Sequence, residues 1–234
     1  MHRHATAAPR TQPSRRELLA IGPIAQLRAG RLGRRIPQLV LGLVLYGTSM
    51  ALLVRSALGV MPWDVLHQGL AHRLPLTFGQ IVIVTSMAVL LLWWPLRQPP
   101  GLGTVLNAVV IGLVVDPVLS WVHEPSGLAA RTGLMAAGLL LNAIATAMYI
   151  GAQLGPGPRD GLMTGWARRT GHSIRLVRTL IEVVVVGVGW LLGGVFGVAT
   201  VAYALLIGPL TQALLPFFTV SLTHPGAAGT ALRE

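Results

Sequence analysis

The chain has 234 residues, of which 53% are hydrophobic and only 11% are charged, and its mean hydropathy is +0.67. Soluble domains carry roughly 25% charged residues, so this composition excludes a soluble single domain. The absence of cysteine from the sequence excludes disulfides, thiol catalysis and cysteine-ligated metals. A formal charge of +11 would suggest nucleic acid on a folded soluble face, but here the basic residues lie between apolar segments. We therefore expect the lipid bilayer, and not nucleic acid, as the partner.

Residues 1–35 are polar, contain proline and are rich in arginine, which predicts a disordered basic tail. Six apolar stretches follow, each long enough to cross about 30 Å of hydrocarbon as a helix. Residues 221–234 are expected to form a second, short tail. The predicted fold class is all-α, a polytopic membrane protein with six transmembrane helices and two short motif helices. The predicted spans are 36–54, 78–96, 102–122, 132–154, 176–194 and 196–220.

Arginine predicts the orientation of these spans. All 18 basic residues are arginines, and a cytoplasmic N-terminus leaves 15 of them on the cytoplasmic side. Only Arg55, Arg73 and Arg131 then fall outside. Because cytoplasmic segments of membrane proteins carry an excess of positive charge, we expect both termini to be cytoplasmic.

The chain also contains an internal repeat. Residues 42–112 align without a gap with residues 138–208, a shift of 96 residues, and 21 of the 71 pairs are identical. The two copies fall in residues 36–131 and 132–220, and each contains three predicted spans. An odd number of spans inserts the second copy upside down, which predicts an inverted repeat of the kind found in transporters. The alternative is an old duplication that is retained only for packing.

Each copy contains an LGxxPxD motif, LGVMPWD in the first and LGPGPRD in the second. Glycine and proline break the preceding helix, and the aspartate is expected to cap a short helix, at 64–73 and at 160–170. Helices of about 15 Å cannot span. They either re-enter the protein, with their polar N-termini converging on a solute or ion, or lie as amphipathic helices at the interface. The pathway residues of the first interpretation are Pro62, Asp64, Pro158 and Asp160.

Other polar residues interrupt the apolar spans. Glu182 lies inside the fifth span, where a carboxylate is costly and marks a functional site by default. Arg178 lies four residues earlier on the same helix face, so a local ion pair is the competing explanation. Thr104, Asn107 and Thr200 are of the type that bonds neighbouring helices, and we include them in the candidate solute or ion pathway.

Small residues and missing motifs complete the pattern. Gly189, Gly193 and Gly197 have G-x-x-x-G spacing, which predicts close helix contacts and offers an oligomer interface. The sequence contains no glycine-rich phosphate loop, no nucleophile elbow and no metal-ligand spacing on one helix face. We therefore expect no cofactor, no metal and no enzymatic activity.

The segments LGVMPWDVLHQGL, GLGTVLNAVVIGLVVD and LGPGPRDGLMTG stand in that order, and over residues 41–217 the chain resembles the YczE/YyaS/YitT-like family of bacterial integral membrane proteins. Its LGxxPWD motif and its G-T-x-x-N element are both present, although the second copy carries Arg159 in place of Trp63. The resemblance implies a bacterial plasma-membrane protein of undetermined role and supplies no catalytic residues. We expect a transporter of a small solute or ion, the alternative being a non-transporting accessory protein that assembles with another complex.

Overall fold

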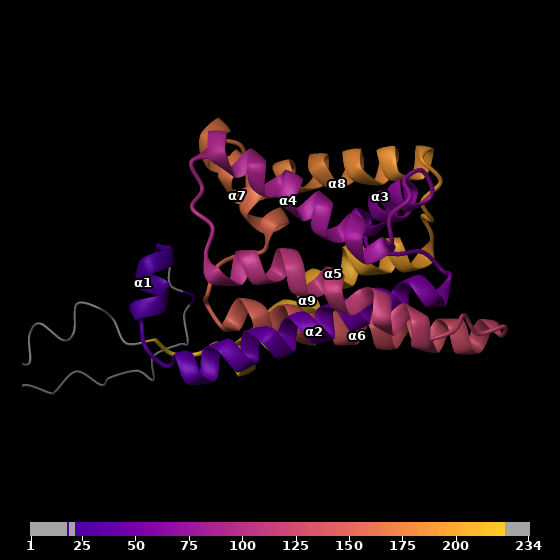
Figure 1. The fold of residues 1–234 in the computed structure, drawn as a ribbon, viewed down its shortest axis with the longest axis horizontal. Coiled ribbons are helices and arrows are strands. Elements are labelled where there is room, and N and C mark those ends of the chain that lie inside the picture. The colour runs from indigo at the N-terminus through magenta and orange to yellow at the C-terminus, as the bar shows by residue number, and fades with distance from the viewer. Residues whose placement is uncertain (1–17, 19–21, 223–234) are drawn as a thin grey trace, which may run out of the picture.

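The computed structural model describes residue 18 and residues 22–222, and the regular structure of that part is entirely helical (Figure 1). The predicted all-α class is confirmed. The helices of the described part are α1 (Pro23–Arg28), α2 (Leu32–Ser56), α3 (Pro62–Ala71), α4 (Phe78–Leu96), α5 (Leu102–Trp121), α6 (Leu128–Gly151), α7 (Pro158–Thr170), α8 (Ile174–Leu191) and α9 (Val198–Phe218).

The long helices form two layers. In one layer α2 packs against α6 and α5, and α6 packs against α9. In the other layer α3 packs against α8 and α4, and α7 packs against α4 and α8 (Figure 1). The contact between α4 and α5 joins the two layers. Each half of the sequence therefore contributes two helices to each layer.

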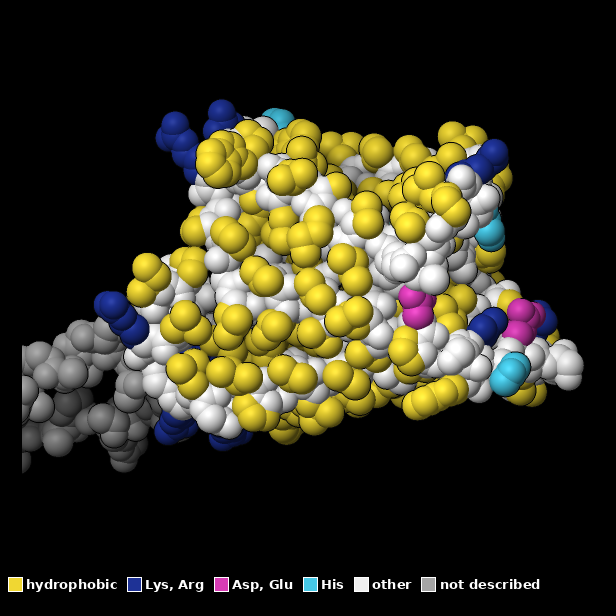
Figure 2. Space-filling view, viewed as in Figure 1, with side chains coloured by type: hydrophobic (Ala, Val, Ile, Leu, Met, Phe, Trp, Pro, Cys, Tyr) yellow, Lys and Arg dark blue, Asp and Glu magenta, His cyan; other side chains and the backbone are white. Residues whose placement is uncertain are grey.

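The outer surface matches a membrane environment. Five helices, α2, α4, α5, α6 and α9, are long and apolar enough to cross a bilayer. Apolar side chains cover the visible flank of the bundle, and most of the charged ones gather at its two ends (Figure 2). Trp94, for example, is 89% exposed. Such a surface is unfavourable in water and favourable in lipid. The chain is a multi-pass membrane protein.

The predicted fifth span corresponds to α8, which does not meet the same criteria. Its first half carries Arg175, Arg178 and Glu182, and these charges interrupt its apolar sequence. The count of six spans therefore stays a prediction.

The predicted N-terminal tail differs from the structure. Part of residues 1–35 is helical, since α1 begins at Pro23 and α2 begins at Leu32. Arg35 is fully buried, because its guanidinium donates to backbone carbonyls of this segment and of the end of α6. Helix ends leave carbonyls without partners, and one arginine here satisfies several. The rest of the two predicted tails, residues 1–17, 19–21 and 223–234, lies outside the described residues.

The two motif helices are present, but the predicted role of their aspartates as caps is wrong. Helix α3 begins at Pro62 and α7 at Pro158, two residues earlier than predicted, and neither has a side-chain cap. Proline is favoured at the first helical position, where its missing N–H costs nothing. Asp64 and Asp160 consequently lie at the third position of their helices, where their carboxylates are available for other contacts.

The loops that precede the motif helices are anchored across the molecule. The Leu58 carbonyl accepts a hydrogen bond from the Ala199 N–H (2.9 Å), and the Leu154 carbonyl accepts one from the Gly103 N–H (2.7 Å). Leu58 and Leu154 are equivalent in the repeat, as are Gly103 and Ala199. Each half therefore binds the start of the last helix of the other half, which holds the motif helices inside the protein.

Candidate functional site

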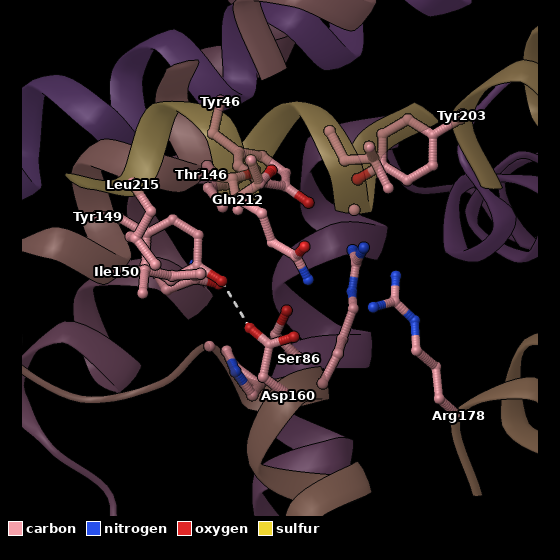
Figure 3. A pocket seen from close by; sticks show the side chains of 18 of the residues that line it. Tyr46, Ser86, Thr146, Tyr149, Ile150, Asp160, Arg178, Tyr203, Gln212 and Leu215 are labelled. Atoms are coloured by element: carbon pink, nitrogen blue, oxygen red, sulfur yellow. Dashed lines mark hydrogen bonds between the residues drawn. The ribbon is translucent and has the colours of Figure 1, made fainter. Parts of the chain in front are cut away.

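A cavity of about 310 Å³ lies where the first turn of α7 faces the layer formed by α2, α5, α6 and α9 (Figure 3). A smaller cavity of about 60 Å³ shares part of its wall and extends to Pro62 and Trp63 at the start of α3. The two motif helices therefore begin at one connected site. Both cavities are lined by Tyr46, Arg159, Asp160, Arg178 and Tyr203.

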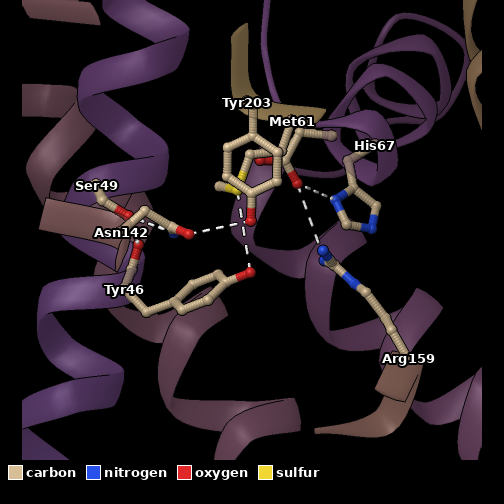
Figure 4. A network of polar contacts seen from close by, with 8 residues as sticks. Tyr46, Ser49, Met61, His67, Asn142, Arg159 and Tyr203 are labelled. Atoms are coloured by element: carbon tan, nitrogen blue, oxygen red, sulfur yellow. Dashed lines mark hydrogen bonds and ion pairs between the residues drawn. The ribbon is translucent and has the colours of Figure 1, made fainter. Parts of the chain in front are cut away.

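Asp64 lies behind this site and is fully buried. Its Oδ1 atom is 2.9 Å from the His67 Nδ1 atom and 3.9 Å from an Arg159 guanidinium nitrogen (Figure 4). Its Oδ2 atom has no hydrogen-bond partner among the residues that the structure describes. A buried carboxylate needs compensating charge or hydrogen bonds, so Arg159 is the cation that holds Asp64 in the interior.

Arg159 connects Asp64 to the cavity. Its guanidinium carbon lies 5.2 Å from the centre of the Trp63 ring, within the range of a cation–π contact. Its side chain is 20% exposed and lines both cavities. Within the described part of the chain, no hydrogen bond from this guanidinium is found, so its N–H donors are available to whatever occupies the cavity.

Asp160 and Arg178 reach into the larger cavity from α7 and α8 (Figure 3). One Asp160 carboxylate oxygen accepts a hydrogen bond from the Tyr149 hydroxyl at 2.5 Å. The Arg178 Nε atom donates to Glu182 at 2.8 Å, which leaves its two terminal nitrogens free of hydrogen bonds to described residues. The predicted local pair of Arg178 and Glu182 is therefore present, and it lies at the cavity wall.

Tyrosines form the opposite wall and were missed by the sequence analysis. All three tyrosines of the chain, Tyr46, Tyr149 and Tyr203, line the larger cavity. The Tyr203 hydroxyl donates to Asn142 (3.0 Å), which in turn donates to Ser49 (2.8 Å), so the ring of Tyr203 is held in place (Figure 4). The signal that could have identified them is the confinement of tyrosine to three positions inside apolar spans.

Of the nine predicted pathway residues, six line the two cavities and three, Asp64, Thr104 and Thr200, do not. Asn107, Pro158, Asp160 and Arg178 line the larger cavity, and Pro62 and Glu182 line the smaller one. Thr104 and Thr200 do not line either cavity. They accept hydrogen bonds from the Gly101 and Gly197 N–H groups (3.2 Å each), and Thr104 also donates to the Pro156 carbonyl (2.7 Å). The two threonines anchor backbone and do not contact the candidate site.

The three glycines with G-x-x-x-G spacing, Gly189, Gly193 and Gly197, pack against other segments of the same chain. A methyl group on Gly189 would clash with Val65 and Leu66 of α3, and one on Gly197 would clash with Leu58. Gly193 has a φ of +102°, and a methyl group there would lie 3.3 Å from His72. An oligomer interface on Gly189 and Gly197 would need these internal contacts to open. Oligomerisation itself stays a prediction.

At one end of the molecule, the start of α4 is held tightly against α5. Asp116 on α5 accepts hydrogen bonds from the Thr77 hydroxyl (2.5 Å) and from the Gly79 N–H (2.8 Å). Gly79 and Gly112 face each other so closely that a methyl group on either would clash with the carbonyl of the other. We call this contact the α4–α5 clamp.

The equivalent contact of the second half is absent from the described helices. The repeat places Ser173, Arg175, Gly208 and Gln212 at the positions of Thr77, Gly79, Gly112 and Asp116. A methyl group on Gly208 would meet nothing within 4 Å, and α8 does not pack on α9 as α4 packs on α5. Gly208 and Gln212 line the larger cavity instead. We call this opening the α8–α9 gap.

Comparisons with known proteins support the motif resemblance. Residues 33–216 match a family of unknown function (DUF6198). An uncharacterised protein of Haemophilus influenzae is 40% identical over 182 residues, which cover 78% of this chain and 84% of the relative. The uncharacterised membrane protein YczE of Bacillus subtilis is 30% identical over 192 residues (81% and 89%), and YyaS of the same organism is 25% identical over 180 residues (75% and 90%). No solved structure matches the chain. The chain therefore belongs to the YczE-like family of uncharacterised membrane proteins.

Proposed function

We propose that this protein transports a small solute or ion across the bacterial plasma membrane by alternating access between its two inverted halves. The observation that carries the proposal is the difference between the α4–α5 clamp and the α8–α9 gap. Two halves with related sequences form the clamp on one side of a central cavity and leave it open on the other. Exchange of these two arrangements would open the same cavity to the opposite side of the membrane.

The inverted repeat is part of this proposal. The hydrogen bond from the Ala199 N–H to the Leu58 carbonyl and the one from the Gly103 N–H to the Leu154 carbonyl are the same contact made twice, once in each direction between the halves. Gly59 and Gly155, which follow these leucines, share a positive φ of +110° and +122°. A twofold relation between the halves accounts for both pairs. With both termini cytoplasmic, the α8–α9 gap faces the cytoplasm, so this conformation is inward-open.

Cross-linking in the cysteine-free chain tests the proposal. Paired cysteines at Thr77 and Asp116 lock the clamp, and paired cysteines at Ser173 and Gln212 lock the gap if α8 can reach α9. A third cysteine at Ser86, in the cavity wall, is then labelled with a membrane-impermeant thiol reagent from either side of oriented vesicles. We expect labelling from the cytoplasmic side with the clamp locked and from the outside with the gap locked.

The same experiment separates transport from the accessory function. In an accessory protein that does not change conformation, the α8–α9 gap would stay open, so the cysteines at Ser173 and Gln212 would not cross-link. Labelling of Ser86→Cys from the same side in both locked forms would overturn alternating access. The control is Ser86→Cys without a locking pair, which should be labelled mainly from the side that this conformation opens.

A further inference from the structure

We infer that the central cavity binds a small zwitterion, whose carboxylate lies against Arg159 and Arg178 and whose ammonium group faces Asp160. The inference rests on the proposed function in that such a ligand would be the transported solute. It is carried by two arginine side chains with free donors and one exposed carboxylate in the wall of the same cavity.

The arginines provide the anion-binding end. Arg159 makes no hydrogen bond within the described part of the chain, and its ion pair with Asp64 is long, at 3.9 Å. Arg178 uses only Nε in its bond to Glu182. A guanidinium has five N–H donors in a planar fork, and unsatisfied donors in the wall of a cavity favour a planar anion such as a carboxylate.

Asp160 and the tyrosines provide the cation-binding end. The Tyr149 hydroxyl bonds one carboxylate oxygen of Asp160, and no described residue bonds the other. Tyr46 and Tyr149 meet edge to face, with ring centres 6.2 Å apart, beside this carboxylate. An exposed carboxylate in the wall of a cavity suits an ammonium group, because its negative charge attracts a cation.

The charge balance of the site favours a ligand that carries both charges. Arg159 and Arg178 are paired with Asp64 and Glu182, whereas Asp160 forms no ion pair with a described residue and accepts a hydrogen bond from a tyrosine. A simple anion would add negative charge to a site that already holds three carboxylates and two guanidinium groups. A simple amine would leave the guanidinium donors without acceptors. A zwitterion satisfies both ends without changing the net charge of the site.

Isothermal titration of the purified full chain in detergent micelles tests this ligand class. The probes are the proteinogenic L-amino acids, each titrated beside its deaminated carboxylate and its decarboxylated amine. We expect at least one amino acid to bind, with both analogues weaker by about tenfold or more. Binding of a carboxylate or an amine as tight as that of its parent amino acid would overturn the inference, as would the absence of binding by any amino acid.

Two variants assign the ends of the ligand. Asp160→Asn keeps an acceptor for Tyr149 and removes the charge, so the affinity for the amino acid should fall to that for its carboxylate analogue. Arg159→Gln should lower the affinity for the amino acid and for the carboxylate together and leave the affinity for the amine unchanged. Glu124→Gln is the matched control, because Glu124 is a carboxylate paired with Arg131 in the α5–α6 loop, outside the cavity. Equal affinity of Asp160→Asn and the unmodified chain for the amino acid would contradict the assignment.

The ligand class and the transport proposal fail separately. The cross-linking of the clamp and the gap requires no ligand. If the gap closes and Ser86→Cys changes sides while no amino acid binds, only the zwitterion is overturned. If an amino acid binds with the expected selectivity while the gap never closes, the site is correct and alternating access is overturned.

Discussion

The guanidinium of Arg159 stacks on the indole of Trp63, 5.2 Å from the ring centre, and these two residues occupy the same position of the two sequence repeats. In the proposed inverted repeat, equivalent residues of the two halves touch only close to the axis that relates the halves. Arg159 stands where the first copy has tryptophan, and the pair places one cation and one ring together in the wall of the smaller cavity. The cation also compensates Asp64, so a departure from the repeat builds the site.

Replacement of Arg159 by glutamine is expected to destabilise the protein by about 1–3 kcal/mol, because it leaves the buried Asp64 carboxylate with His67 as its only partner among the described residues. The free energy of unfolding is measured by SDS titration in mixed micelles. The double variant Arg159→Gln with Asp64→Asn should cost less than the sum of the single variants, because it removes both charges. Additive costs would show that the two groups do not interact.

Arg131→Gln is the control for this cycle. Its partner Glu124 is 46% exposed, and exposed ion pairs contribute about 0–1 kcal/mol. If Arg131→Gln lowers the free energy of unfolding as much as Arg159→Gln does, the destabilisation is a general effect of removing an arginine.

The sequence predicts the helices better than it predicts their contacts. Hydropathy locates the five long apolar helices, because each is a continuous run that lipid requires. Hydropathy cannot decide whether α8 spans the membrane, because Arg175, Arg178 and Glu182 interrupt its apolar sequence. Arg178 lines the cavity. The cap prediction failed because capping rules consider only the local chain, whereas Asp160 bonds Tyr149 of the preceding helix.

The candidate site is predictable in part for the same reason. Asp160, Arg178 and Glu182 stand out because charge in an apolar run is costly. Tyr46 and Tyr203 do not stand out, because tyrosine is tolerated in such runs and its role depends on helices far apart in sequence. The asymmetry of the clamp and the gap is invisible to the repeat alignment, which makes the two halves alike.

Alanine at Gly112 and at Gly208 is expected to have opposite effects on stability. In α5 the new methyl group clashes with the Gly79 carbonyl and with Ile83, which costs about 1–3 kcal/mol. In α9 it meets open space, and the better helix propensity of alanine gains up to about 1 kcal/mol. Unfolding in mixed micelles measures both variants. Equal destabilisation by the two substitutions would contradict the open α8–α9 gap.

Alanine at Gly59 or at Gly155 is expected to destabilise the protein by similar amounts. Both glycines have φ values that L-residues rarely adopt, which costs about 1–3 kcal/mol, and both abut the backbone of the other half. Gly171 is the matched control, since its φ is +73° while its surroundings are open. Gly171→Ala should therefore show the backbone cost without the clash. If all three variants are destabilised equally, the contact of Gly59 and Gly155 with the other half contributes nothing to stability.

Single cysteines at Ser126 and Thr170 are expected to be labelled from opposite sides of the membrane. Ser126 lies between α5 and α6 and Thr170 ends α7, and both are exposed. The excess of arginine around Thr170 predicts the cytoplasmic side for it and the outer side for Ser126. The measurement is the reaction of each variant with an impermeant maleimide in intact cells and in inverted vesicles. The cysteine-free parent is the blank, because the chain has no thiol of its own. Labelling of both positions from one side would be incompatible with the inverted repeat, since the helices between them would then cross the membrane an even number of times.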